Sequence, residues 1–256
     1  MIPLYDDVPA RKFPVVTVTL IVINVLIFLF EWLLSDAELQ KLFYEAGVVP
    51  ALTSGYMQPD GFVGPDGTPV PPFTPLSPVL TPLTSMFLHG GVAHVMGNML
   101  FLWIFGDNVE DRIGRFRYLL FYLLAGYIAA LAHILSNTAS PLPTVGASGA
   151  IAGVMGAYLV GFPNAKLAVI VPPFVFVRLW VPAFVFLILW FVLQFLGGWF
   201  DWMSIGDTGG VAFMAHVGGF VIGLLAGWIV RSRPGWTRPN YTKDQKRAAR
   251  GSEYER

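Results

Sequence analysis

Residues 146–162 read G-A-S-G-A-I-A-G-V-M-G-A-Y-L-V-G-F, an apolar run without a charged residue. Gly149 and Gly153 share one helix face, where small residues let two helix backbones approach closely in lipid. The expected helix, 148–162, has only 15 residues. At 1.5 Å per residue it covers about 22 Å of a hydrocarbon core about 30 Å thick. We therefore expect neighbouring helices to enclose this segment, which begins below the membrane surface.

Five further apolar segments flank this run and complete six predicted spans. The chain is 55% hydrophobic and 12% charged, with a mean hydropathy of +0.63, whereas a soluble domain carries about 25% charged residues. The pattern predicts an all-α, polytopic membrane protein whose first span is retained and is not a signal peptide. We expect a short N-terminus (1–12), a membrane domain (13–230) with a long Pro- and Gly-rich loop (35–80), and a polar tail (231–256). The spans are predicted at 13–34, 84–105, 118–136, 148–162, 179–197 and 211–230.

The basic residues predict the orientation of these spans. Lys and Arg favour cytoplasmic loops. With the N-terminus inside, 15 of the 16 basic residues fall on cytoplasmic segments, and Lys41 alone lies outside. We therefore expect both termini in the cytoplasm and the loop 35–80 on the outer side. The segment 163–178 is then a cytoplasmic loop.

Several classes of function are disfavoured by what the sequence lacks. There is no cysteine, which excludes disulfides, thiol nucleophiles and Cys-bound metals. No HExxH motif is present for a zinc protease, and no carboxylate lies in the middle of a span for a paired-aspartate protease or an ion-coupled transporter. The net charge is zero, so the composition gives no attraction to nucleic acid. We expect no metal and no organic cofactor.

The polar residues within the spans point to nucleophilic catalysis. Ser148 opens the fourth span, while His94 and His216 lie early in the second and sixth, all within about 15 Å of the outer boundary. Small residues on the fourth and sixth spans, Gly219 and Gly223 among them, permit close contact of these two helices. If the two stripes face each other, His216 can accept the proton of Ser148 and activate it.

A second polar pair predicts a place for the oxyanion of such a reaction. His94 and Asn98 are four residues apart and share a helix face, and both can donate a hydrogen bond. No acidic residue is available at this depth as a third member. We therefore expect a Ser–His dyad without an acidic partner.

Three motifs, in this order, resemble those of the rhomboid intramembrane serine proteases of the bacterial six-helix type. They are H-G-G-V-A-H-V-M-G-N (89–98), G-A-S-G (146–149) and A-H-V-G-G-F-V-I-G (215–223), and the resemblance covers roughly residues 84–230. It implies a six-helix rhomboid fold with Ser148 as nucleophile and His216 as general base. It further implies that His94, Asn98 and the backbone N–H of Ser148 line the oxyanion site, with Gly146 in the serine motif and His89 as a structural residue.

The resemblance also implies substrates and a location. Substrates would be single-span membrane proteins cut near the outer end of their helix, in a bacterial plasma membrane. The fifth span and the loop 198–210 would form the lateral gate and the lid. The lipid bilayer is then the surrounding partner, and nothing in the sequence indicates an oligomeric state.

Two departures from the family pattern concern the site. Many relatives carry an aromatic residue one turn after the serine, packed on the catalytic imidazole, whereas this chain has Ala152. The orientation of His216 must therefore come from elsewhere. The Trp-Arg pair often found before the second span is replaced by Leu80-Thr81.

These residues are also open to other interpretations. Ser148 alone is compatible with a packing role, His216 and the His94–Asn98 pair with structural hydrogen bonds, and His133 matches no motif and is assigned to structure. The main alternative function is a catalytically inactive rhomboid-like protein that binds transmembrane clients. A small transporter is a third hypothesis, which the absence of mid-membrane charge disfavours.

Overall fold

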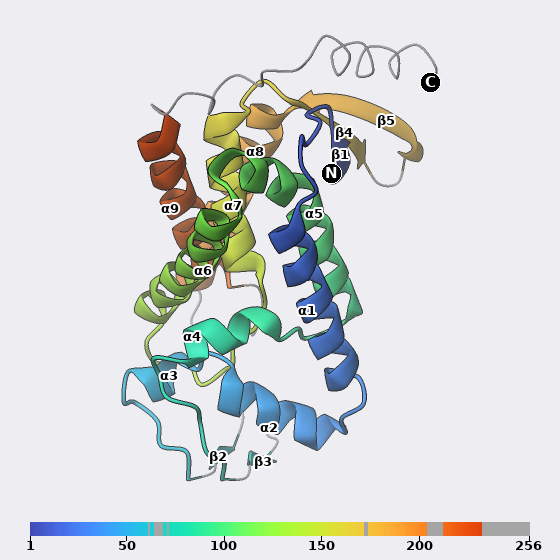
Figure 1. The fold of residues 1–256 in the computed structure, drawn as a ribbon. Helices are drawn as coiled ribbons and strands as arrows, with labels where there is room; N and C mark the ends of the chain where they lie inside the picture. Colours follow the sequence, from blue (N-terminus) through green and yellow to red (C-terminus); the bar gives the residue numbers. More distant parts are fainter. Residues whose placement is uncertain (61, 64–68, 71, 172–173, 204–211, 232–256) are drawn as a thin grey trace.

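The computed structural model describes residues 1–60, 62–63, 69–70, 72–171, 174–203 and 212–231 (Figure 1). Its main body is a bundle of six apolar helices that correspond to the six predicted spans. These are α1 (Val15–Glu31), α5 (Val92–Ile113), α6 (Arg115–Ser136), α7 (Ser148–Gly161), α8 (Ala183–Met203) and α9 (Phe213–Arg231). The mostly helical, polytopic architecture expected from the sequence is confirmed.

The six helices differ in how well each matches a membrane span. Within the described residues, α6 and α9 are long and apolar enough to cross a membrane alone, and a bent pair ending in α5 qualifies if it counts as one span. The helices α1 and α7 and the apolar part of α8, Ala183–Gly197, are shorter. The shortness of α7 was expected. Its residues from Gly149 to Tyr158 are all buried, so its enclosure by neighbouring helices is confirmed.

The second predicted span, 84–105, is divided by a sharp bend. The chain forms α4 (Thr81–Thr84) and the 3-10 turn η1 (Ser85–Phe87). It then bends by 96° before α5 begins at Val92. The adjacent glycines Gly90 and Gly91 lie at this break, where backbone freedom favours a change of direction. His94 is therefore in the first turn of α5.

A layer of short elements covers one end of the bundle (Figure 1). The loop predicted at 35–80 contains α2 (Asp36–Ala46), α3 (Pro50–Thr53) and the small strand pair β2 (Phe62–Val63) and β3 (Pro69–Val70). A capping box formed by Ser35 and Glu38 starts α2. The bridge between Val48 and Thr144 joins this layer to the segment that precedes α7.

A three-stranded antiparallel sheet lies at the opposite end of the bundle (Figure 1). Its order is β1 (Ile2–Asp6), β4 (Lys166–Val171) and β5 (Phe174–Pro182), with Leu167 opposite Val181. The prediction of a loop over 163–178 was wrong, and so was the start of the fifth span at Leu179, because β5 continues to Pro182. Alternating β-branched and aromatic residues favour this hairpin.

Hydrogen bonds to carboxylates stabilise the end of the bundle nearest the sheet. Glu110 of α5 accepts hydrogen bonds from the backbone N–H groups of Val16 and Thr17, at 3.0 and 2.8 Å, and so caps α1. Asp6 of β1 accepts hydrogen bonds from Tyr158 of α7 and from Asn108 of α5. Burial raises the pKa of Asp6 to about 7. The N-terminal strand therefore fixes the end of α7 that lies farthest from Ser148.

Two predicted segments fall partly outside the described residues. The lid expected at 198–210 begins as helix, because α8 continues to Met203, which corrects that boundary. Residues 204–211 and the tail from 232 to 256 lie outside the described residues.

Candidate active site

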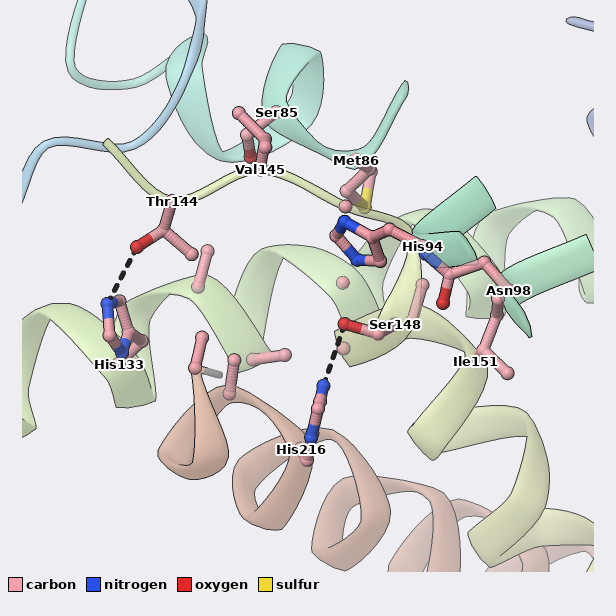
Figure 2. Close-up of a pocket in the computed structure, with 18 of the residues that line it drawn as sticks. Ser85, Met86, His94, Asn98, His133, Thr144, Val145, Ser148, Ile151 and His216 are labelled. Carbon is pink, nitrogen blue, oxygen red and sulfur yellow. Dashed lines mark hydrogen bonds between the residues drawn. The ribbon is translucent and has the colours of Figure 1, made fainter. Parts of the chain in front are cut away.

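Ser148 and His216 are in direct contact. The Nε2 atom of His216, on α9, lies 2.7 Å from the Oγ atom of Ser148, the first residue of α7 (Figure 2). This is a normal length for a hydrogen bond to a hydroxyl group. His216 is only 8% exposed. The hydrogen bond expected from the sequence is present.

Glycines make the close approach of α7 and α9 possible. A Cβ atom on Gly219 would lie 2.0 Å from the carbonyl oxygen of Gly149, and one on Gly223 would lie 2.0 Å from that of Gly153. No larger side chain fits at such a distance from a backbone atom. The two small-residue stripes therefore face each other, as expected, and their contact places His216 beside Ser148.

The turn before Ser148 lies against both η1 and α5. Gly146 has a φ of +128°, which side chains other than glycine rarely adopt, and its N–H donates to the carbonyl of Ser85 at 2.8 Å. A Cβ atom here would lie 2.7 Å from the His94 ring and 3.6 Å from Nδ2 of Asn98. The serine turn thus lies directly against both predicted oxyanion residues, as Figure 2 shows.

Asn98 presents a free donor in this region. It is 7% exposed, and its buried Nδ2 has no hydrogen-bond partner within the described part of the chain. An unsatisfied buried amide is costly, and its N–H can donate to a group that enters the site. The backbone N–H of Ser148 is also without a partner inside its own helix, because α7 begins at that residue. Two kinds of donor therefore border the serine hydroxyl.

His89 packs against the ring of His94. Its buried ring lies edge-on to that of His94, with centroids 5.2 Å apart, and its backbone N–H donates to the carboxylate of Glu31 at 3.2 Å. Glu31 is itself buried at the end of α1. The structure therefore places His89 behind His94, away from the dyad, and adds Glu31, which the sequence analysis did not single out.

The second nitrogen of His216 contacts α8. Nδ1 lies 2.6 Å from Oε1 of Gln194, and the indole of Trp190 packs on the imidazole with centroids 5.7 Å apart. Ala152, where relatives carry an aromatic residue, is fully buried and offers no polar group. Both contacts were missed from the sequence. Gln194 had a signal, since it is the single amide side chain in the otherwise apolar segment 179–197.

The dyad opens into a cavity of about 710 Å³. Its lining includes His94, Asn98 and small residues of α5 and α6. His133 also faces it, where its Nε2 lies 2.8 Å from Oγ1 of Thr144 (Figure 2). The described lining contains no carboxylate. Among the described residues, no group of three or more His, Asp or Glu side chains is placed to hold a metal ion.

The comparison with known families identifies the chain's relatives. A family model described as the Rhomboid domain matches residues 78–233, more than half of the chain. The chain belongs to the rhomboid family. The match begins just before α4, ends just after α9, and contains every residue of the site described above except Glu31.

Individual relatives agree with this family. The chain is similar to rhomboid protease GluP of Bacillus subtilis, 46% identical over 86 residues, which are 33% of this chain and 16% of GluP. It is 30% identical to RHOMBOID-like protein 5 of Arabidopsis thaliana over 161 residues, 62% of this chain and 47% of that protein. Rhomboid protein 1, mitochondrial, of Saccharomyces cerevisiae is 33% identical over 153 residues, 57% and 40% of the two chains. The matched part thus spans less than half of each relative.

Proposed function

We propose that this protein is an intramembrane serine endopeptidase that hydrolyses peptide bonds of membrane proteins with a Ser148–His216 dyad. The observation that carries the proposal is the 2.7 Å contact between Oγ of Ser148 and Nε2 of His216 beside a cavity lined by the unpartnered Nδ2 of Asn98. A serine hydroxyl is a weak nucleophile until a base removes its proton, and an imidazole nitrogen at this distance is suited to that task.

The reaction follows from this geometry. Nε2 of His216 accepts the proton of Ser148 as Oγ attacks the carbonyl carbon, and the carbonyl oxygen becomes an oxyanion. Asn98, His94 and the N–H of Ser148 donate hydrogen bonds to it. The imidazolium then gives its proton to the leaving amine, and an acyl-enzyme remains. A water molecule, deprotonated by the same nitrogen, hydrolyses the ester and restores Ser148.

The position of the site supports membrane-embedded substrates. Ser148, His94 and His216 all lie in the first turns of apolar helices that begin at the same end of the bundle, near the layer formed by α2, α3 and α4. With the orientation that the basic residues favour, this end is the outer side of a bacterial plasma membrane and both termini are cytoplasmic. The proposed substrates are single-span proteins cut near the outer end of their helix.

A reconstituted cleavage assay tests the function. Purified protein in liposomes would be mixed with single-span reporters, and the products identified by mass spectrometry. We expect cleavage near the outer end of the reporter helix in wild type and none with Ser148→Ala. Absence of cleavage for every reporter, with an active rhomboid protease as positive control, would favour the inactive client-binding alternative.

A further inference from the structure

The two ring nitrogens of His216 have different partners, and together these define its protonation. Nδ1 faces the amide oxygen Oε1 of Gln194 at 2.6 Å, and Nε2 faces the hydroxyl of Ser148 at 2.7 Å. An amide oxygen only accepts hydrogen bonds, so with the Gln194 amide in this orientation Nδ1 is the donor and carries the proton. In a neutral imidazole this leaves the lone pair on Nε2, directed at Ser148. That is the tautomer that a general base acting on Ser148 requires.

The face of the His216 ring also packs against α8, the helix that carries Gln194. Trp190 and Gln194 are four residues apart on α8 and therefore share one helix face. Trp190 packs on the imidazole at an interplanar angle of 39° and also contacts Phe220, one turn after His216 on α9. Thus α8 contacts the ring at its edge and on its face.

No nearby acidic group competes for this task in the described part of the site. The titratable side chains that line the cavity with His216 are His94 of α5 and His133 of α6, and the described lining has no carboxylate. On α7, the methyl group of Ala152 provides no hydrogen bond. Besides Ser148, Gln194 is therefore the hydrogen-bond partner that the described structure places against the ring of His216.

We propose that Gln194 is the positioning residue of this site, a neutral third member that holds His216 in the tautomer able to deprotonate Ser148. The inference rests on the proposed function of the dyad. As Nε2 takes the serine proton, the ring becomes cationic, and the Nδ1–H hydrogen bond to Gln194 becomes charge-assisted and stronger. The Nδ1 proton stays in place throughout. Gln194 thus stabilises the transition state more than the ground state and affects the chemical step more than binding.

Three variants on α8 test this role with a fluorescent fluorophosphonate, which reacts with activated serines. Gln194→Leu removes the acceptor at similar size, and we expect the maximal labelling rate to fall about 10- to 100-fold, with the probe's half-saturating concentration nearly unchanged. Gln194→Glu keeps an acceptor oxygen, so it should retain labelling. Its carboxylate stabilises the imidazolium, so the acid limb of the rate profile should move to higher pH. Leu193→Ala, on the exposed side of the helix, should leave both rate and profile unchanged.

The tautomer itself can be measured without any activity. In ¹⁵N-histidine-labelled protein, with His216→Ala used to assign the resonance, we expect Nδ1 of His216 to be protonated in wild type and the tautomers to mix in Gln194→Leu. A wild-type ring protonated at Nε2 would overturn the inference, as would a wild-type rate and pH profile in Gln194→Leu. If Gln194→Leu does not fold, the wild-type tautomer and the Gln194→Glu profile decide the matter. If wild-type protein is not labelled at Ser148, the result counts against the proposed function. A failure of the proposed function is thereby distinguished from a failure of the Gln194 proposal.

Discussion

The helices α7 and α8 both contact His216, but they differ in how the bundle holds them. Residues Gly149 to Tyr158 of α7 are all buried, and glycines join the helix to α9 backbone against backbone. In contrast, α8 exposes large apolar side chains along much of its length, and Leu193 is 56% exposed. The proposed nucleophile and its proposed base therefore come from two helices that pack backbone against backbone. The two residues that contact the His216 ring from α8 therefore come from a helix with a wide exposed apolar surface.

The largest effect on stability and labelling should come from separating α7 and α9. Gly219→Ala places a Cβ atom 2.0 Å from the carbonyl oxygen of Gly149, so α7 and α9 must separate. We expect a loss of stability of about 3 kcal/mol and loss of fluorophosphonate labelling, measured by thermal unfolding in detergent and by gel fluorescence.

The matched control is Gly97→Ala in α5, where a Cβ atom meets nothing within 4 Å. It should keep or raise the unfolding temperature, because alanine favours helix over glycine by about 1 kcal/mol. Equal unfolding temperatures for Gly219→Ala and Gly97→Ala would contradict the close packing of α7 and α9.

The next largest effect should come from the oxyanion side of the site. Asn98→Ala removes the buried, unpartnered Nδ2 donor, and we expect the rate of the chemical step to fall about 100- to 1,000-fold with little change in KM. Reporter cleavage in liposomes measures both constants. The control is Asn24→Ala, which removes a different buried asparagine, on α1. It should lower stability but leave the rate constant at saturating substrate unchanged. A normal rate in Asn98→Ala would exclude Asn98 from oxyanion stabilisation.

Acidification should stop the labelling of Ser148 in a way that identifies its base. A protonated His216 cannot accept the serine proton, so the labelling rate should fall about tenfold per pH unit below the midpoint of its titration. The measurement is the labelling rate over a pH series in which thermal unfolding shows the protein to be folded. A rate that stays flat to well below the histidine range would contradict the role of His216.

The smallest effect on activity should come from a change at Asp6 of β1, which contacts the end of α7 nearest the sheet. Burial raises the pKa of Asp6 from 3.8 to about 7, so the folded protein holds this proton more tightly than the unfolded chain. The contribution of Asp6 to stability is therefore complete below about pH 4 and is lost as pH rises through about 7. Asp6→Asn should remove this slope from the curve of unfolding temperature against pH, and labelling of Ser148 should change less than about twofold. Identical curves for both proteins would show that Asp6 does not titrate in this way.

The contact between Ser148 and His216 could be anticipated from sequence because both residues lie beside small-residue stripes with helical spacing. The spacing permits close contact of the two helices, and the structure shows that the stripes face each other. The bend before α5 was missed because apolar residues lie on both sides of Gly90 and Gly91, and hydropathy does not report a change of direction. The hairpin of β4 and β5 was missed because its apolar residues resemble the start of a membrane span.

The partners of His216 could not be predicted for a different reason. The contact between Gln194 and His216 depends on the rotation and tilt of α8 against α9, and neither follows from hydropathy. Polar residues in membrane helices often hydrogen-bond to neighbouring helices, so Gln194 could have been marked as a contact residue, but its partner could not. Trp190 carried no signal, because aromatic residues are frequent throughout this segment.

Covalent capture of Ser148 tests the central claim most directly. Detergent-solubilised wild type, Ser148→Ala and His216→Ala would be treated side by side with a fluorescent fluorophosphonate, and the modified residue identified by mass spectrometry. The Ser148–His216 dyad predicts labelling of wild type at Ser148 alone and none in either variant. An unlabelled wild type beside a labelled active rhomboid protease, or labelling that persists in His216→Ala, would contradict it.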